Sequence, residues 1–232
     1  KFEKFEKLQT ILEHDPDIIV CGVSSIGIEW FVRQISKNYK KGIPIILLTK
    51  GLSILDNELT TLSDKIRNFL SKDGHSEINI SAIKGPCLAA GLANKVRTGT
   101  VIANKDIKES QSLKEIISTN YYSTEISEDI NGVELSGAIK NIYSMLIGAS
   151  EGLSNSKASK EIQSKFFLNT AASLIHRSIS EMVKFVSHYG GKAETVYGLS
   201  GLGDLYVSAI GGRNSLMGKY LGEGYLYNDA KE

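Results

Sequence analysis

Two apolar runs, IIVCGV at residues 18–23 and IPIILL at residues 43–48, decide the fold class of this chain. Each run is short and rich in β-branched residues, which is typical of a strand buried on both faces of a parallel sheet. Between them, apolar residues recur at helical spacing over residues 26–38. The order strand, helix, strand predicts a βαβ unit.

The alternation continues along the chain to about residue 130. We expect an amphipathic helix in the first fourteen residues and a helix whose apolar face runs from Leu55 to Leu70. Further segments are predicted as strands over 78–83 and 100–103, a helix over 107–118 and a stretch of mixed strand character over 121–127. Alternating strands and helices predict parallel pairing, so residues 1–130 are expected to form an incomplete, Rossmann-like dinucleotide-binding domain.

From residue 131 the pattern becomes helical. Long apolar stripes over residues 133–149 and 167–186 predict two helices, and Gly190-Gly191 would end the second. We therefore expect an α/β protein, in which a partial Rossmann-like parallel sheet is followed by an all-α substrate domain over residues 131–232.

The composition argues against several classes of function. The 232 residues are 41% apolar and carry a formal net charge of +1, so no overall field favours nucleic acid or an anionic membrane surface. No apolar run approaches the length of a membrane span. The two cysteines and four histidines lack metal-ligand spacing, which predicts no metal site and favours reduced thiols in the cytoplasm.

The run GVELSGAIKN at residues 132–141 contains the first candidate for chemistry. Gly137 and Ala138 precede Lys140, so another backbone or a flat ligand could approach the helix closely at this point. A lysine dehydrated there would have a lowered pKa and could exchange a proton near neutral pH. Spacing alone favours the alternative, a solvated lysine on a helix surface, because most helical lysines are exposed.

The segment from Gly198 to Gly224 contains two further candidates. In Gly211-Gly212-Arg213-Asn214, backbone amides at a helix N-terminus together with an arginine would suit a phosphate. An ordinary turn with Asn214 as the helix N-cap is an equal alternative. Asp204, in GLGDL, could orient a lysine or accept a hydrogen bond from a substrate hydroxyl.

Two segments follow predicted strands, where ligands of open α/β sheets collect. LLTKGL at residues 47–52 presents Lys50, and KGPCLAAGLA at residues 84–93 presents Gly85 in a turn. Ordinary loops are the alternative for both. The four candidate segments gain weight together, because two belong to the expected sheet domain and two to the helical one, and they carry cationic groups.

Taken in order, LLTKGL, KGPCLAAGLA, GVELSGAIKN, GLGDL and GGRN resemble the NAD-dependent glycerol-3-phosphate dehydrogenase family. In that family a TKG lysine is followed by a GPSFA-like turn, by GVELCGALKN, by GxGDL and by an RN pair. The resemblance extends from about Asp17 to Gly224. It implies an oxidoreductase that interconverts dihydroxyacetone phosphate and sn-glycerol 3-phosphate with NAD(H) or NADP(H), linking glycolysis to glycerophospholipid synthesis.

The resemblance also implies a role for each matching residue. Lys140 would transfer the proton, Lys50 would be a second catalytic lysine, and Asp204 would be the aspartate of the substrate pocket. Substrate contacts are implied for Lys50, Gly85, Cys87, Lys140, Asp204, Gly212, Arg213 and Asn214. Cofactor contacts are implied for Lys50, Ala89 and Arg213.

The chain departs from the family pattern at several points. Cys87 and Gly212 stand where bacterial members usually have serine, and Gly212 matches the GGRN form of eukaryotic members. No GxGxxG turn precedes Asp17, and the chain stops near Glu232, before the family's final helices. We therefore expect an incomplete chain that binds NAD(P)H poorly as written, while its long apolar helices favour a homodimer.

Two alternative functions remain open at this point. A related dehydrogenase acting on a β-hydroxy acid also uses a Lys-Asn pair borne on a helix. A non-catalytic protein could keep the fold without the dinucleotide turn.

Overall fold

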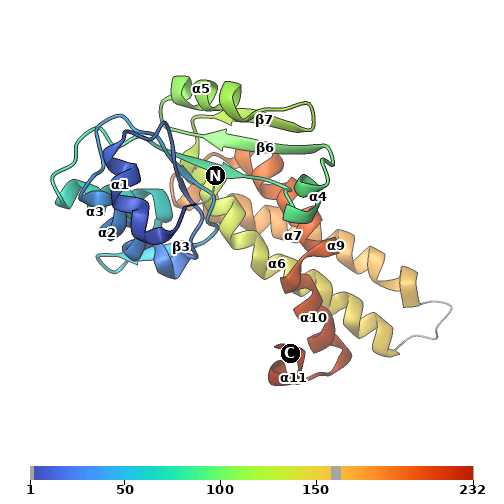
Figure 1. Ribbon diagram of the computed structural model, residues 1–232. Helices are drawn as coiled ribbons and strands as arrows, with labels where there is room; N and C mark the ends of the chain where they lie inside the picture. Colours follow the sequence, from blue (N-terminus) through green and yellow to red (C-terminus); the bar gives the residue numbers. More distant parts are fainter. Residues whose placement is uncertain (1–2, 158–162, 232) are drawn as a thin grey trace.

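The computed structural model describes residues 3–157 and 163–231, which form a five-stranded sheet with helices on both faces, followed by a helical region (Figure 1). The strands are β1 Ile19–Cys21, β2 Ile45–Leu47, β3 Leu52–Leu55, β4 Glu58–Thr61, β5 Ile80–Lys84, β6 Thr98–Ala103 and β7 Tyr122–Ser127. The helices are α1 Leu8–Glu13, α2 Ile28–Ser36, α3 Leu62–Lys72, α4 Ala89–Ala93, α5 Ile107–Ile117, α6 Ile130–Lys157, α7 Gln163–His188, α8 Ala193–Tyr197, α9 Asp204–Gly211, α10 Arg213–Glu223 and α11 Tyr227–Lys231. Short 3₁₀ turns, η1 Phe5–Lys7 and η2 Ser25–Gly27, and a π-helical turn, η3 Leu199–Gly203, complete the elements.

The main sheet has the order β1-β2-β5-β6-β7 and is mixed, which corrects one part of the prediction. β1, β2 and β5 are parallel as expected, and β6 and β7 are parallel to each other, but β5 and β6 are antiparallel. The reason lies in the connection between them, because its helix α4 has five residues and spans only about 7 Å at 1.5 Å per residue. A helix that short cannot carry the chain back along a strand, so the chain returns beside β5 in the opposite direction.

The helix expected from Leu55 begins only at Leu62, which is a second correction. The preceding residues form an antiparallel hairpin of β3 and β4, in which Leu55 pairs with Glu58. The two turn residues, Asp56 and Asn57, have positive φ angles of 51° and 66°, which aspartate and asparagine tolerate better than most residues. Thr61 then caps α3, its Oγ1 accepting a hydrogen bond from the Asp64 amide at 3.2 Å.

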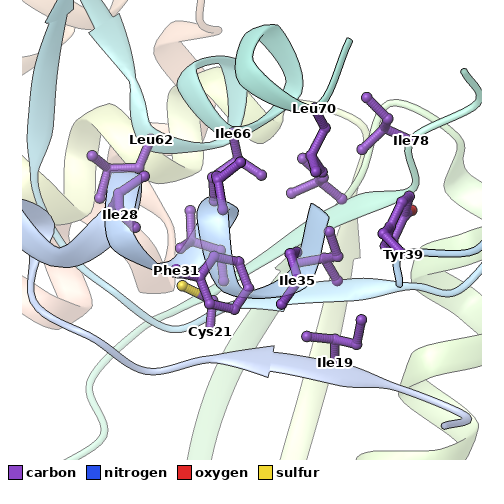
Figure 2. Close-up of a cluster of buried hydrophobic side chains, with 14 of the residues drawn as sticks. Ile19, Cys21, Ile28, Phe31, Ile35, Tyr39, Leu62, Ile66, Leu70 and Ile78 are labelled. Carbon is purple, nitrogen blue, oxygen red and sulfur yellow. The ribbon is translucent and has the colours of Figure 1, made fainter. Parts of the chain in front are cut away.

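The largest core cluster lies between the sheet and helices α1, α2 and α3. In Figure 2, Ile28 and Phe31 of α2 face Leu62 and Ile66 of α3, with Cys21 of β1 beneath them. The opposite face of the sheet is covered by α5, whose Leu113 packs in a separate cluster with Ile46, Ile83 and Ile102. Side chains at alternating strand positions therefore enter two cores, as expected for buried strands.

Helix α6 connects the sheet to the helical region. Its first residues, Ile130 and Val133, pack with Ala82 of β5 and with β6, whereas its later residues pack against α7 and α10. The helix is longer than the predicted span of residues 133–149, and Ile142 on its predicted apolar face is 57% exposed. Because α6 packs both on the sheet and within the helical region, the domain boundary at residue 131 stays a prediction.

Glycines allow α6 and α10 to approach backbone to backbone. A Cβ added at Gly148 would lie 2.0 Å from the Ser215 carbonyl oxygen, and one at Gly218 would lie 2.0 Å from that of Met145. No side chain fits at such distances. The glycines therefore set the separation of the two helices, and Figure 1 shows α10 crossing the distal half of α6.

We expect Gly148→Ala to lower the free energy of unfolding by about 1–3 kcal/mol, because the new methyl group forces α10 away from α6. The matched control is Gly91→Ala in α4, where the added Cβ would meet only Val96, at 3.9 Å. Urea unfolding followed by circular dichroism measures both free energies of unfolding. Equal stability of the two variants would contradict the close packing.

Candidate functional site

The centre of the candidate site is the buried carboxylate of Asp204, the first residue of α9. Asp204 is 2% exposed. Its Oδ2 accepts a hydrogen bond from Lys50 Nζ at 2.5 Å, and its Oδ1 accepts one from Lys140 Nζ at 2.8 Å. Lys140 also donates to Ser208 Oγ, one turn along α9. Two ammonium groups thus share one carboxylate, which leaves the cluster with a net positive charge.

Lys140 is 4% exposed, so the alternative of a solvated helix lysine was wrong. Burial lowers the pKa of Lys140 and the cation of Lys50 lowers it further, whereas Asp204 opposes both effects. The close approach expected at Gly137 is made by a side chain of the same protein, because an added Cβ there would lie 3.2 Å from Lys84 Cδ.

Lys50 links the buried cluster to an open cavity. It lies just after β2, and its side chain is 29% exposed. Its Nζ also donates to the Gly85 carbonyl oxygen at 3.4 Å, so the ends of β2 and β5 are joined through it. Of the two lysines, Lys140 is enclosed and Lys50 is accessible.

The turn after β5 requires glycine at its first position. Gly85 has a φ of 144°, and a Cβ there would lie 2.9 Å from Thr100 Cα. The Cys87 amide donates to the Gly85 carbonyl oxygen at 2.8 Å and tightens the turn. A Cβ added at Gly203 would lie 3.6 Å from the Pro86 ring, so this turn packs directly on the segment that leads into Asp204.

A cavity of about 630 Å³ opens beside Lys50 along the α5 face of the sheet. It is bordered by Ile18, Val20, Ile46, Leu48, Lys50, Ile83, Lys84, Gly85, Cys87, Ala89, Leu92, Thr100, Ile117, Thr119, Tyr121 and Tyr122. Its volume lies within the range of small-molecule sites, and its mainly apolar walls with one accessible ammonium group fit a flat heteroaromatic ring. Burial raises the pKa of the Cys87 thiol, which keeps it a weak neutral donor.

Arg213 and Asn214 lie at the start of α10, away from the lysines and the aspartate. Gly212 takes the N-cap position without a side-chain cap, so the alternative in which Asn214 caps the helix was wrong. Arg213 borders a separate hollow of about 300 Å³ that also contains Glu151 and Lys219. Helix α9, about 12 Å long at 1.5 Å per residue, separates this end from Asp204.

The GGRN segment nevertheless neighbours the turn after β5. A Cβ added at Gly211 would lie 3.7 Å from Leu88 Cδ1, between Cys87 and Ala89 in sequence. The structure therefore gathers Lys50, Lys140, Asp204 and Gly85 by direct contact, with Cys87 and Ala89 on the adjoining cavity wall.

Three buried polar residues around the cluster were not predicted from the sequence. Ser208 lies four residues after Asp204, a spacing that places both on one helix face and could have indicated it. Lys84 is 2% exposed and Glu134 is 1% exposed. Burial lowers the pKa of Lys84 to about 8 and raises that of Glu134. No sequence pattern distinguishes either residue from a surface charge.

Two other kinds of site are absent from residues 3–157 and 163–231. No group of three histidine, cysteine, aspartate or glutamate side chains there could hold a metal ion. Within the same residues, no helix is long and apolar enough to cross a membrane.

Comparison with known proteins gives consistent matches across the chain. The family model for the N-terminus of NAD-dependent glycerol-3-phosphate dehydrogenase matches residues 6–110, and that for the C-terminus matches residues 129–232. An NADP(+)-dependent glycerol-3-phosphate dehydrogenase from Archaeoglobus fulgidus is 33% identical over 98% of this chain and 64% of its own length. A glycerol-3-phosphate dehydrogenase [NAD(P)+] from Clostridium tetani is 30% identical over 92% of this chain and 57% of its own length.

Solved structures extend the comparison to three dimensions. The crystal structure of glycerol-3-phosphate dehydrogenase from Coxiella burnetii aligns with a TM-score of 0.78 and 30% identity, over 92% of this chain and 60% of that one. The enzyme from Saccharomyces cerevisiae aligns with a TM-score of 0.81 at 21% identity, over 97% and 62% of the two chains, and supports the fold alone.

The chain thus spans somewhat less than two thirds of these relatives. One family model matches most of the sheet region and the other matches the helical region, and together they include Lys50, Lys140 and Asp204. The chain belongs to the NAD-dependent glycerol-3-phosphate dehydrogenase family.

Proposed function

We propose that the protein interconverts dihydroxyacetone phosphate and sn-glycerol 3-phosphate with NAD(H) or NADP(H). The observation that carries the proposal is the Asp204 carboxylate, held between buried Lys140 and accessible Lys50 beside the cavity. A ketone reduction needs a proton donor for the carbonyl oxygen, and an anionic substrate is favoured by local positive charge. The cluster offers both.

Lys140 serves as the proton donor. Its ammonium group protonates the carbonyl oxygen of dihydroxyacetone phosphate as that oxygen becomes a hydroxyl, and its amine accepts the proton in the reverse reaction. Asp204 and Ser208 hold the amine in place through their hydrogen bonds. Lys50 stabilises negative charge as it develops on the same oxygen.

We assign the cavity wall to the nicotinamide end of the cofactor, with Lys50 and Ala89 as contacts. When bound there, the nicotinamide supplies or accepts the hydride. The apolar walls exclude water from the reacting atoms, which strengthens the electrostatic effect of the nearby lysines. Arg213 is the third cofactor contact implied by the family resemblance.

We assign the substrate phosphate to the start of α10. Arg213 presents a guanidinium group there, Asn214 adds an amide, and Gly212 leaves the first backbone amides of the helix uncovered by a side-chain cap. The positive end of the helix dipole and the arginine favour a dianion together. Gly85 and Cys87, which line the cavity beside Lys50, are assigned as further substrate contacts.

A cytoplasmic location and a homodimer belong to the same proposal. Cys21 and Cys87 are both free, which is usual for a reducing compartment. Light scattering on the full-length protein measures the mass in solution, and a monomeric mass would contradict the dimer.

We expect Lys140→Ala to lower kcat for reduction of dihydroxyacetone phosphate by at least ~10²-fold in the full-length protein, because the proton donor is lost. The control is Lys184→Ala, which removes an exposed helical lysine of α7. The oxidation of NADH or NADPH is followed by absorbance. An unchanged kcat in Lys140→Ala would contradict the assignment of Lys140 as the proton donor. Absence of turnover by the parent protein would favour a non-catalytic protein.

We expect Arg213→Ala to raise KM for dihydroxyacetone phosphate by about 10-fold or more, because a charge-assisted contact to the phosphate is worth about 1.5–3 kcal/mol. The KM for a β-hydroxy acid without phosphate should not rise by a similar factor in Arg213→Ala. Steady-state kinetics with both substrate classes measure the difference. A preference for the β-hydroxy acid, insensitive to Arg213, would instead indicate a related dehydrogenase.

The pH dependence should follow the lowered pKa of Lys140. Reduction requires the ammonium form, so its rate falls as pH rises through that pKa, which lies below the ordinary lysine value of 10.5. Lys50→Met removes a neighbouring cation and should move this alkaline limb to higher pH, in addition to slowing the reaction. Lys184→Met is the control. If the pH at which the rate falls is the same in Lys50→Met as in the parent, the electrostatic coupling of Lys50 and Lys140 is contradicted.

A further inference from the structure

Lys84 is the last residue of β5. It contacts both elements that carry the amines of the lysine-aspartate cluster, which consists of Lys50, Lys140 and Asp204. Its Nζ donates to the carbonyl oxygen of Leu47 at 3.0 Å. Leu47 ends β2, and Lys50 follows it closely in the chain. The Lys84 stem lies against Gly137 of α6, one turn before Lys140. One side chain therefore connects the strand of Lys50 to the helix of Lys140.

Burying the Lys84 ammonium group costs hydration free energy, which indicates that the residue has a specific role. A cation that is 2% exposed loses nearly all its hydration, and burial is the largest influence on its lowered pKa. The opposing attraction comes mainly from Glu134, which is also on α6 and is 1% exposed. A methionine would fill the same volume without this cost.

Glu134 attracts the Lys84 cation electrostatically and connects α6 to a third element. Its Oε1 accepts a hydrogen bond from the Ser63 amide at the start of α3, at 3.3 Å. Its Oε2 is buried without a hydrogen-bond partner among the described residues, so Lys84 provides the main compensation for its charge. Lys84 of β5 thus bonds to β2 and packs on α6, and Glu134 of α6 bonds to the start of α3. The two buried charged residues therefore connect these four elements.

We propose that Lys84 is a positioning residue: it ties the end of β2 to α6 and so fixes the separation of Lys50 and Lys140 around Asp204. The neighbouring residue contributes to the same geometry, because the Gly85 carbonyl oxygen accepts a hydrogen bond from Lys50. The role in catalysis rests on the function proposed above. The role in holding the two amines can be measured without turnover.

The test replaces both buried charges together, in Lys84→Met/Glu134→Gln, so that neither is left unpaired. The glutamine keeps an acceptor for the Ser63 amide, and replacing a buried charge pair by neutral groups commonly preserves stability. The matched control, Lys65→Met/Glu29→Gln, removes a 2.8 Å ion pair between α3 and α2. All variants are made in the full-length protein and checked by thermal unfolding.

Two readouts are taken from each variant. The first is steady-state reduction of dihydroxyacetone phosphate, in which we expect kcat to fall ~10-fold with KM changed little, as for a small misplacement of reacting groups. The second is competitive acetylation by acetic anhydride, resolved by lysine with mass spectrometry. We expect acetylation of Lys50 and Lys140 to rise ~3-fold or more, because their bonds to Asp204 open more often.

A second variant tests the proposal if the double variant does not fold. Gly137→Ala keeps every polar group, suits a helix interior and crowds the Lys84 stem by its added Cβ at 3.2 Å. It should raise acetylation of Lys50 and Lys140 by a smaller factor, about 2-fold, for the same reason. Acetylation equal to that of the control in every folded variant overturns the proposal. If the parent does not reduce dihydroxyacetone phosphate, the proposed function fails, and acetylation alone decides the role of Lys84.

Discussion

The arrangement of this protein depends on one carboxylate, that of Asp204, held between the ammonium groups of Lys50 and Lys140. Each partner comes from a different element: β2 leads to Lys50, α6 carries Lys140 and α9 begins at Asp204. Two cations on one anion leave positive charge around a carboxylate that is only 2% exposed, where electrostatic interactions are stronger than in water. Such a site attracts anions although the net charge of the whole chain is only +1. The charge balance that matters is therefore local.

Much of the sheet could be predicted because its signals are local. Buried strands such as IIVCGV are continuous apolar runs, and the helix between the first two strands has clear periodicity. The hairpin over residues 52–61 was missed because Leu55, Leu59 and Leu62 fit a helical stripe, whereas the Asp56-Asn57 turn that overrides it is a weak signal. The antiparallel pairing of β5 and β6 depends on the path of a connection with a short helix, which periodicity does not report.

The site was predictable to the extent that its residues lie in recognisable segments. Lys50 and Asp204 are more than 150 residues apart in sequence, and only folding joins them. Their association was expected from an ordered set of motifs, since spacing alone favoured an exposed Lys140. Lys84 and Glu134 also lie within two of these segments, but their burial could not be predicted, because a charged residue at the end of a strand or on a helix usually faces water. Their burial follows from how β5 packs under α6, which is a tertiary property.

Helix α6 explains how the sheet and the helical region can share one site. It is fixed at one end where Gly137 meets Lys84, and further along where Gly148 meets the backbone of α10. These contacts lie about 16 Å apart at 1.5 Å per residue, with Lys140 between them. Lys140 and the start of α10 therefore belong to one closely packed unit, whereas Lys50 and the cavity belong to the sheet. Under the proposed function, the first unit holds the substrate and the second holds the nicotinamide. The Lys50–Asp204 bond and the contact of Lys84 with Gly137 both cross between these two units, and together they set the position of one reactant relative to the other.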